Sequence, residues 1–167
     1  MEQALSNVSP EALRGAMRLW ATGVTIVTAK LDGYCHGMTV SSFTSISLDP
    51  PLVMVSLEYS TRTHDMVAET GFFGITILSE GQQAISERFA GRLSDSQDRF
   101  TGLDTFTMET GAPFVVGGLA FMDCQVTSRI EAGGHTLFIA QVVATRFITD
   151  HDKPIIYFNR SYRHLCS

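Results

Sequence analysis

A run of hydroxyl side chains near residue 40 is the first place where this sequence could bind a polar ligand. The segment His36-Gly37-Met38-Thr39-Val40-Ser41-Ser42-Phe43-Thr44-Ser45 lies at a predicted strand end and the loop after it. Hydroxyls donate and accept hydrogen bonds, and a glycine lets the backbone approach a ligand closely. The segment therefore suits a planar polar ring or a phosphate. Serine and threonine also bond to nearby backbone in ordinary strands and turns, so the residues alone leave that structural interpretation open.

A second polar segment, Ser60-Thr61-Arg62-Thr63, follows a predicted strand at 52–57 and precedes a predicted helix at 63–69. Hydroxyls, backbone donors and one guanidinium converge there, at the end of a helix whose dipole attracts anions. The segment predicts a phosphate site. An ordinary helix N-cap beside a solvated Arg62 explains the same spacing equally well.

His135 follows Gly133-Gly134 at the predicted mouth of a hairpin. A histidine titrates near neutral pH and could orient or protonate a cofactor, although a single histidine in a turn is more often incidental. The five histidines show neither i, i+4 nor tight-turn spacing, so we predict no metal site. The sequence also lacks the glycine-rich dinucleotide and P-loop fingerprints, the zinc-protease motif and the nucleophile elbow.

Composition narrows the functional class further. The 167 residues are 44% hydrophobic, with 12 basic and 17 acidic side chains and a net charge of −5, so no nucleic-acid partner is expected. Cys35, Cys124 and Cys166 are odd in number and far apart, which fits a reducing compartment. Neither a secretion signal nor an 18-residue apolar run occurs, so we expect a cytoplasmic protein that does not bind membranes.

The elements that must position these residues are mostly strands. Without internal repeats or linkers, residues 1–167 are predicted to form one domain, mainly β with α additions and arranged as an antiparallel barrel. The predicted elements are a helix at 10–20, a hairpin of 24–29 and 36–42, strands at 52–57 and 72–78, helices at 63–69 and 79–91, a polar excursion at 92–112, a hairpin of 119–130 and 135–148, a strand at 154–158 and a tail at 160–167.

Several motifs, in order from Leu19 to Leu165, resemble the flavin reductase family of two-component monooxygenases. This family includes the reductase partners of styrene, 4-hydroxyphenylacetate and nitrilotriacetate monooxygenases. The motifs are Ala21-Thr22-Gly23-Val24-Thr25, the segment 36–45 followed by Leu48-Asp49-Pro50-Pro51-Leu52-Val53-Met54-Val55-Ser56-Leu57, then Glu87-Arg88-Phe89-Ala90-Gly91 and Gly134-His135-Thr136-Leu137-Phe138.

The resemblance implies a Greek-key split β-barrel that forms a homodimer and binds flavin near the dimer interface. It implies an NAD(P)H:flavin oxidoreductase that reduces free FAD or FMN with NADH, or alternatively NADPH. The reduced flavin would diffuse to a partner monooxygenase that oxidises an aromatic or other small organic substrate.

Carried over position by position, the resemblance also implies site residues. The flavin ring and ribityl chain would contact Thr39, Val40, Ser41, Ser42, Ser56 and Leu57. The phosphate would contact Ser60, Arg62 and Thr63, and the residues closing over the flavin would be Arg88 and Phe89. The nicotinamide side would be formed by His135, Asn159, Arg160, Ser161 and Tyr162, with His135 as the catalytic residue.

Two positions depart from the family pattern, and two other functions remain open. Many relatives have Asn where Ser41 stands and Asp where Gly134 stands. We expect the first difference to alter a hydrogen bond to the flavin ring. The second removes a charge that could orient His135. A flavin-holding electron carrier or sensor on the same barrel would keep its flavin and turn over slowly. A non-enzymatic small-ligand barrel would bind no flavin at all.

Overall fold

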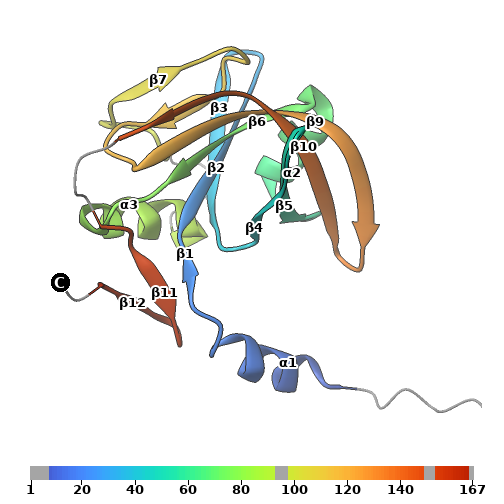
Figure 1. Ribbon diagram of the computed structural model, residues 1–167, viewed down its shortest axis with the longest axis vertical. Helices are drawn as coiled ribbons and strands as arrows, with labels where there is room; N and C mark the ends of the chain where they lie inside the picture. The colour runs from blue at the N-terminus through green and yellow to red at the C-terminus, as the bar shows by residue number, and fades with distance from the viewer. Residues whose placement is uncertain (1–7, 93–97, 149–152, 166–167) are drawn as a thin grey trace, which may run out of the picture.

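Seven antiparallel strands form the main sheet of this computed structural model, which describes residues 8–92, 98–148 and 153–165. They are β2 (Thr25–Leu31), β3 (Tyr34–Val40), β4 (Phe43–Leu48), β5 (Pro51–Glu58), β6 (Phe72–Ile77), β9 (Ala120–Ala132) and β10 (His135–Phe147). Their order in the sheet is β3-β2-β6-β9-β10-β5-β4. The edge strands β3 and β4 are joined only by Ser41 and Ser42, so the sheet must curl until its edges approach each other, as Figure 1 shows.

Smaller elements surround this curled sheet. β1 (Thr22–Gly23), β11 (Ile156–Phe158) and β12 (Ser161–Arg163) form a three-stranded sheet, and β7 (Thr105–Thr107) pairs with β8 (Pro113–Val115). The helices are α1 (Pro10–Met17), α2 (Arg62–Thr70) and α3 (Gln83–Glu87), the last lying between a 3-10 turn at Glu80–Gln82 and a π turn at Arg88–Arg92. In Figure 1 the β11–β12 hairpin stands beside α3, and α1 extends away from the sheet.

Local sequence explains where the first two helices begin and end. Ser9 caps α1 because its side chain accepts a hydrogen bond from the Ala12 N–H at 3.2 Å. Thr61 does the same for α2 by accepting the His64 N–H at 3.3 Å. α2 ends at Gly71, whose φ of +75° is a left-handed conformation that glycine adopts at little cost. The Thr61 cap therefore fixes the start of α2, and Gly71 fixes its end.

Two apolar clusters hold the fold together. The larger fills the inside of the curl with β-strand residues such as Val55, Phe73 and Phe138, and α2 adds Met66 and Val67 to it. The smaller includes Ile26, Leu78, Phe89 and Ile155 and lies towards the β1–β11 side. Burial also raises the pKa of the Cys124 thiol in the larger cluster, so this group stays protonated.

The fold class is confirmed: the chain is mainly antiparallel β with few helices. The long hairpin predicted at 119–130 and 135–148 is also confirmed, with Gly133 at a φ of +59° in its turn. The Ser79–Gln82 capping signal is present as well, because the Ser79 N–H donates to Gln82 Oε1 at 3.1 Å.

Several predicted boundaries are wrong. α1 ends at Met17 rather than at residue 20. None of its residues is buried, so no contact with the protein core stabilises a longer helix. The helix predicted at 79–91 is broken, because Ala90 and Gly91 leave helical geometry and Gly91 has a φ of +79°. Residues predicted as loop or tail form β4, β7 and β12, since pairing with β5, β8 and β11 outweighs their polar composition.

Some predictions fall outside the described residues. They include His151, Cys166, the first seven residues and part of the excursion at 92–112. Within the described ranges, none of the helices is both long and apolar enough to cross a membrane. Cys35 and Cys124 are free thiols in the same ranges.

Candidate functional site

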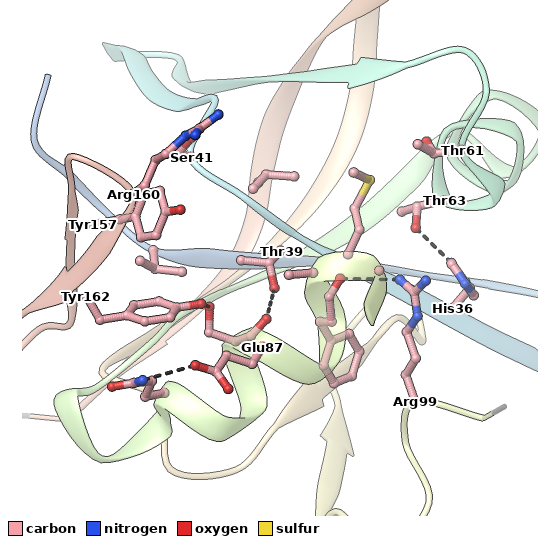
Figure 2. A pocket seen from close by; sticks show the side chains of 18 of the residues that line it. His36, Thr39, Ser41, Thr61, Thr63, Glu87, Arg99, Tyr157, Arg160 and Tyr162 are labelled. Atoms are coloured by element: carbon pink, nitrogen blue, oxygen red, sulfur yellow. Dashed lines mark hydrogen bonds between the residues drawn. The ribbon is translucent and has the colours of Figure 1, made fainter. Parts of the chain in front are cut away.

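A cavity of about 700 Å³ opens between β3, the start of α2, the α3 segment and the β11–β12 hairpin. Figure 2 shows Thr61 and Thr63 at one side of it and Tyr157, Arg160 and Tyr162 at the opposite side. Sites for small organic ligands commonly occupy about 300–1,000 Å³. The predicted residues that line this cavity are Thr39, Val40, Ser41, Ser60, Arg62, Thr63, Phe89, Arg160, Ser161 and Tyr162.

Strand β3 forms one wall, and its hydroxyls also serve the fold. Thr39 Oγ1 donates to the Ser86 carbonyl at 2.7 Å and thereby ties β3 to α3. The Val40 carbonyl accepts a bond from Thr25 Oγ1 at 3.0 Å. Ser41 follows at the end of the strand, and it makes no side-chain hydrogen bond within the described residues. Its hydroxyl is therefore available to a ligand in the cavity.

The start of α2 forms the polar end of the cavity. Thr63 is fully buried, and its Oγ1 lies 2.9 Å from Nδ1 of His36, which is 6% exposed and also lines the cavity. Arg62 is exposed, and it donates to the Tyr34 hydroxyl at 3.0 Å while lying 5.3 Å above that ring. Backbone N–H groups at the first turn of a helix and a positioned guanidinium together favour an anionic group.

The floor combines a predicted residue with one that sequence analysis missed. Phe89 is fully buried in the π turn that follows α3. Arg99, only 7% exposed, lines the cavity and donates to the Gly37 carbonyl at 2.8 Å and the Phe89 carbonyl at 3.3 Å. It therefore joins β3 to the floor. The sequence did not indicate this role, because Arg99 lies next to Phe100 in an excursion that was predicted to lie on the surface.

The β11–β12 hairpin forms the opposite wall. The Tyr162 hydroxyl and Ser86 Oγ lie 2.8 Å apart, which fixes the hairpin against α3. The Tyr157 and Tyr162 rings meet edge to face at 5.3 Å. Tyr157 lines the cavity but was not predicted, since an exposed aromatic in a short strand carries no distinguishing pattern.

The charge of the lining favours an anion. Among the described residues that line the cavity, the permanently cationic side chains are Arg62, Arg99 and Arg160, and the acidic one is Glu87. Glu87 accepts a hydrogen bond from the Gln83 side-chain amide at 3.0 Å. The described residues contain no group of three or more His, Cys, Asp or Glu that could hold a metal ion.

Five predicted flavin or nucleotide contacts lie elsewhere. Ser42 and Asn159 line a neighbouring cavity instead. The Ser56 carbonyl accepts a bond from Ser42 Oγ at 2.7 Å, whereas Leu57, next along β5, is fully buried in the apolar core. Arg88 Nη1 donates to the Thr101 carbonyl at 3.0 Å. Ser56 and Leu57 are neighbours on β5, so their side chains face opposite sides of the strand, and neither lines the cavity.

His135 also lies outside the cavity. It is exposed at the tip of the β9–β10 hairpin, where it pairs with Glu58 of β5. The tip is held next to the segment leading into α2, because the Tyr59 N–H donates to the Gly134 carbonyl at 3.0 Å. Among the histidines of the described residues, His36 on β3 lines the cavity.

Known proteins resemble the chain over nearly its whole length. Residues 17–166 match the model of the flavin reductase like domain. The chain is 39% identical over 158 residues to the NADH-dependent flavin reductase StyB of Pseudomonas fluorescens, covering 93% of this chain and 90% of that protein.

Two solved structures agree with the fold. The styrene monooxygenase flavin reductase (SMOB) from Pseudomonas putida S12 superposes with a TM-score of 0.81 at 38% identity, covering 93% of this chain and 97% of that one. The NADH:FAD oxidoreductase SgcE6 of Streptomyces globisporus, in complex with NAD and FAD fragments, gives 0.87 at 29% identity, covering 97% and 98%. With its fold, its cavity and these matches in agreement, this chain belongs to the flavin reductase like domain family.

Proposed function

We propose that this protein uses NADH to reduce FAD or FMN and supplies the reduced flavin to the separate oxygenase of a two-component monooxygenase. The observation that carries the proposal is an anion-accepting cavity, lined by hydroxyls and aromatic rings, in a chain that belongs to the flavin reductase like domain family. The related styrene monooxygenase flavin reductase serves such a system. We place the reaction in the cytoplasm, where NADH and reduced thiols are maintained.

The cavity fits a flavin in size and in the chemistry of its lining. Its volume of about 700 Å³ suits a tricyclic ring with a ribityl phosphate. We assign the phosphate to the cationic end at Ser60, Arg62 and Thr63, where the first turn of α2 also attracts negative charge. We assign the ring to the wall formed by Thr39, Val40 and Ser41, above Phe89.

The nicotinamide side of the site is assigned to the β11–β12 hairpin. Arg160, Ser161 and Tyr162 face the cavity from the wall opposite α2, so a second ring entering there would meet the flavin rather than its phosphate. The bond between Tyr162 and Ser86 holds this wall at a fixed distance from the floor. Asn159, at the turn of the same hairpin, lines the neighbouring cavity.

The cofactors supply the reaction itself, which is transfer of a hydride from a dihydronicotinamide to a flavin. The residues that line the cavity would bind the two rings next to each other and orient them for this transfer. Ser41 can donate a hydrogen bond to a ring edge on which negative charge develops. No side chain of this chain needs to transfer a proton during hydride transfer.

The proposal includes a homodimer built on a split barrel. Large apolar side chains remain exposed on α1 and on the edge strand β4, including Leu13 at 57% and Leu48 at 90%. A second copy of the chain would cover such residues. We propose that His135, on the outward β9–β10 tip, contributes to the NADH side in that assembly.

Anaerobic reduction of added flavin tests the function. Purified protein should bleach the visible absorption band of oxidised FMN or FAD when NADH is added, at a rate far above that of NADH and flavin alone. Loss of flavin fluorescence should give micromolar binding. NADH oxidation that does not depend on added flavin would exclude the proposed reaction. A flavin that stays bound through gel filtration, together with slow NADH oxidation, would favour an electron carrier.

A further inference from the structure

One face of β3 supports the first two residues of α2. Tyr34 and His36 are two positions apart on this strand, so their side chains point to the same side, with ring centroids 6.4 Å apart and an interplanar angle of 21°. Tyr34 contacts Arg62, the first residue of α2. His36 contacts Thr63, the next residue along the helix. Both α2 residues belong to the proposed phosphate site, so β3 supports this site from outside the helix.

The contact at His36 fixes the position of the helix. Thr63 is fully buried, and its Oγ1 lies 2.9 Å from His36 Nδ1, as the dashed line in Figure 2 shows. About one turn further along α2, Met66 and Val67 are buried in the larger apolar cluster. The start of α2 is therefore held without Tyr34. A change confined to the Tyr34 hydroxyl should act on the Arg62 side chain and not on the helix.

The contact at Tyr34 holds the Arg62 side chain. Arg62 Nη1 donates to the phenolic oxygen at 3.0 Å, and the guanidinium carbon lies 5.3 Å from the ring centroid, where a cation is attracted to an aromatic face. Within the described ranges, Arg62 makes no other side-chain hydrogen bond and no ion pair. An exposed arginine otherwise samples many rotamers, and ordering it when a ligand binds costs free energy. Tyr34 removes part of this cost in advance, and the remaining guanidinium N–H groups can donate to a phosphate.

We propose that Tyr34 is a positioning residue through which this protein selects flavins with a 5′-phosphate, FMN and FAD, over riboflavin. The inference rests on the proposed function, which places the flavin phosphate at Arg62. Tyr34 is 44% exposed and lines neither this cavity nor its neighbour, so it acts through Arg62. It keeps the guanidinium in the orientation that meets the phosphate. Riboflavin has no phosphate, so its binding does not depend on Tyr34.

Removing the hydroxyl alone tests this role. In Tyr34→Phe the ring stays beneath the guanidinium but the hydrogen bond is lost. The Kd for FMN should rise about threefold, the size expected when one ordered side chain is released. The Kd for riboflavin and the kcat with saturating FMN should keep their wild-type values. In an Arg62→Gln background the same change should have no further effect on the Kd for FMN, because the two residues act as one unit.

Tyr59→Phe is the matched control. Tyr59 is 39% exposed and lies just before α2, but its hydroxyl makes no hydrogen bond among the described residues and it lines neither cavity. This variant should leave the Kd for both flavins unchanged in fluorescence titrations. An unchanged Kd for FMN in Tyr34→Phe would overturn the proposal. Equal weakening of FMN and riboflavin, or an additive effect with Arg62→Gln, would overturn it as well.

The titrations need no NADH, so they separate this inference from the proposed function. A wild-type chain that binds FMN but does not oxidise NADH with it would contradict the proposed reaction, while the Kd values would still decide the role of Tyr34. Equal Kd values for FMN and riboflavin in the wild-type chain would overturn the inference alone. A wild-type chain that binds neither flavin would overturn both.

Discussion

At the scale of single residues, Arg62 distinguishes phosphate binding from ring binding. Its guanidinium is exposed and is oriented by the Tyr34 hydroxyl at 3.0 Å. Arg62→Gln should raise the Kd for FMN about tenfold, because one exposed charge-assisted contact with phosphate is lost. The Kd for riboflavin, which has no phosphate, should not change. Fluorescence titration with both flavins checks this, and equal weakening of both would contradict the assignment of the phosphate to α2.

Arg99 should matter for stability as well as for binding. It is 7% exposed and donates to the carbonyls of Gly37 and Phe89. Arg99→Met leaves both carbonyls without this donor and should lower the free energy of unfolding by about 2–4 kcal/mol. Arg99→Lys keeps one donor and should cost less. Urea unfolding measures both variants, and a loss in Arg99→Met no larger than in the exposed control Arg163→Met would contradict this role.

Residue types predicted the polar surfaces of the site better than the individual contacts. Ser60, Arg62 and Thr63 line the cavity because a helix start requires such residues at one place. Ser56 and Leu57 do not line it, because β5 pairs with β4 and β10 and contributes no residue to the cavity, and sequence does not show which strands border a cavity. Arg99 was missed because only tertiary structure brings residue 99 against β3, and sequence shows no periodic signal for such a contact.

At the scale of elements, the end of α2 depends on a single backbone conformation. Gly71 has a φ of +75°, and a Cβ there would meet only the end of the Arg129 side chain at 4.0 Å. Gly71→Ala should therefore destabilise the protein by about 1 kcal/mol through backbone strain rather than through a clash. Gly81→Ala is the control, because its Cβ would have open space and no positive φ applies. Equal losses of unfolding free energy in Gly71→Ala and Gly81→Ala, measured in urea, would show that the left-handed conformation of Gly71 does not cause the destabilisation.

The two longest strands were predicted correctly, whereas β4, β7 and β12 were not. The hairpin of β9 and β10 contains two strands of 13 residues around a glycine turn, which gives a clear local signal. β7 and β12 contain 3 residues each, and their sequences are typical of loops. β4 is rich in hydroxyls and was predicted as a loop, although pairing with β5 satisfies its backbone. In each of these cases the partner is the neighbouring strand in the sequence, and the segment is recognised as a strand only once that pairing is known.

At the scale of the whole molecule, the folded chain leaves apolar surface uncovered. α1 has a clear apolar face but no buried residue, and Leu48 at the edge of the main sheet is 90% exposed. An exposed edge strand also presents unpaired backbone groups. This exposed apolar surface does not stabilise a monomer, whereas a symmetric dimer would bury the same surface on both subunits. The composition of the chain predicts a core but does not show which apolar residues serve association instead.

Self-association is therefore the last property to test. Sedimentation equilibrium should show that the wild-type chain is a dimer. Leu13→Glu and Leu48→Glu, made separately, should each weaken the dimer by at least about tenfold wherever the side chain lies within the interface, because each places a charge among apolar groups. Glu69→Gln, an exposed change on α2, is the control. A monomeric wild-type chain would contradict the homodimer, and His135 would then have no partner site to reach. Dimers unaffected by both substitutions would contradict the placement of the interface at α1 and β4.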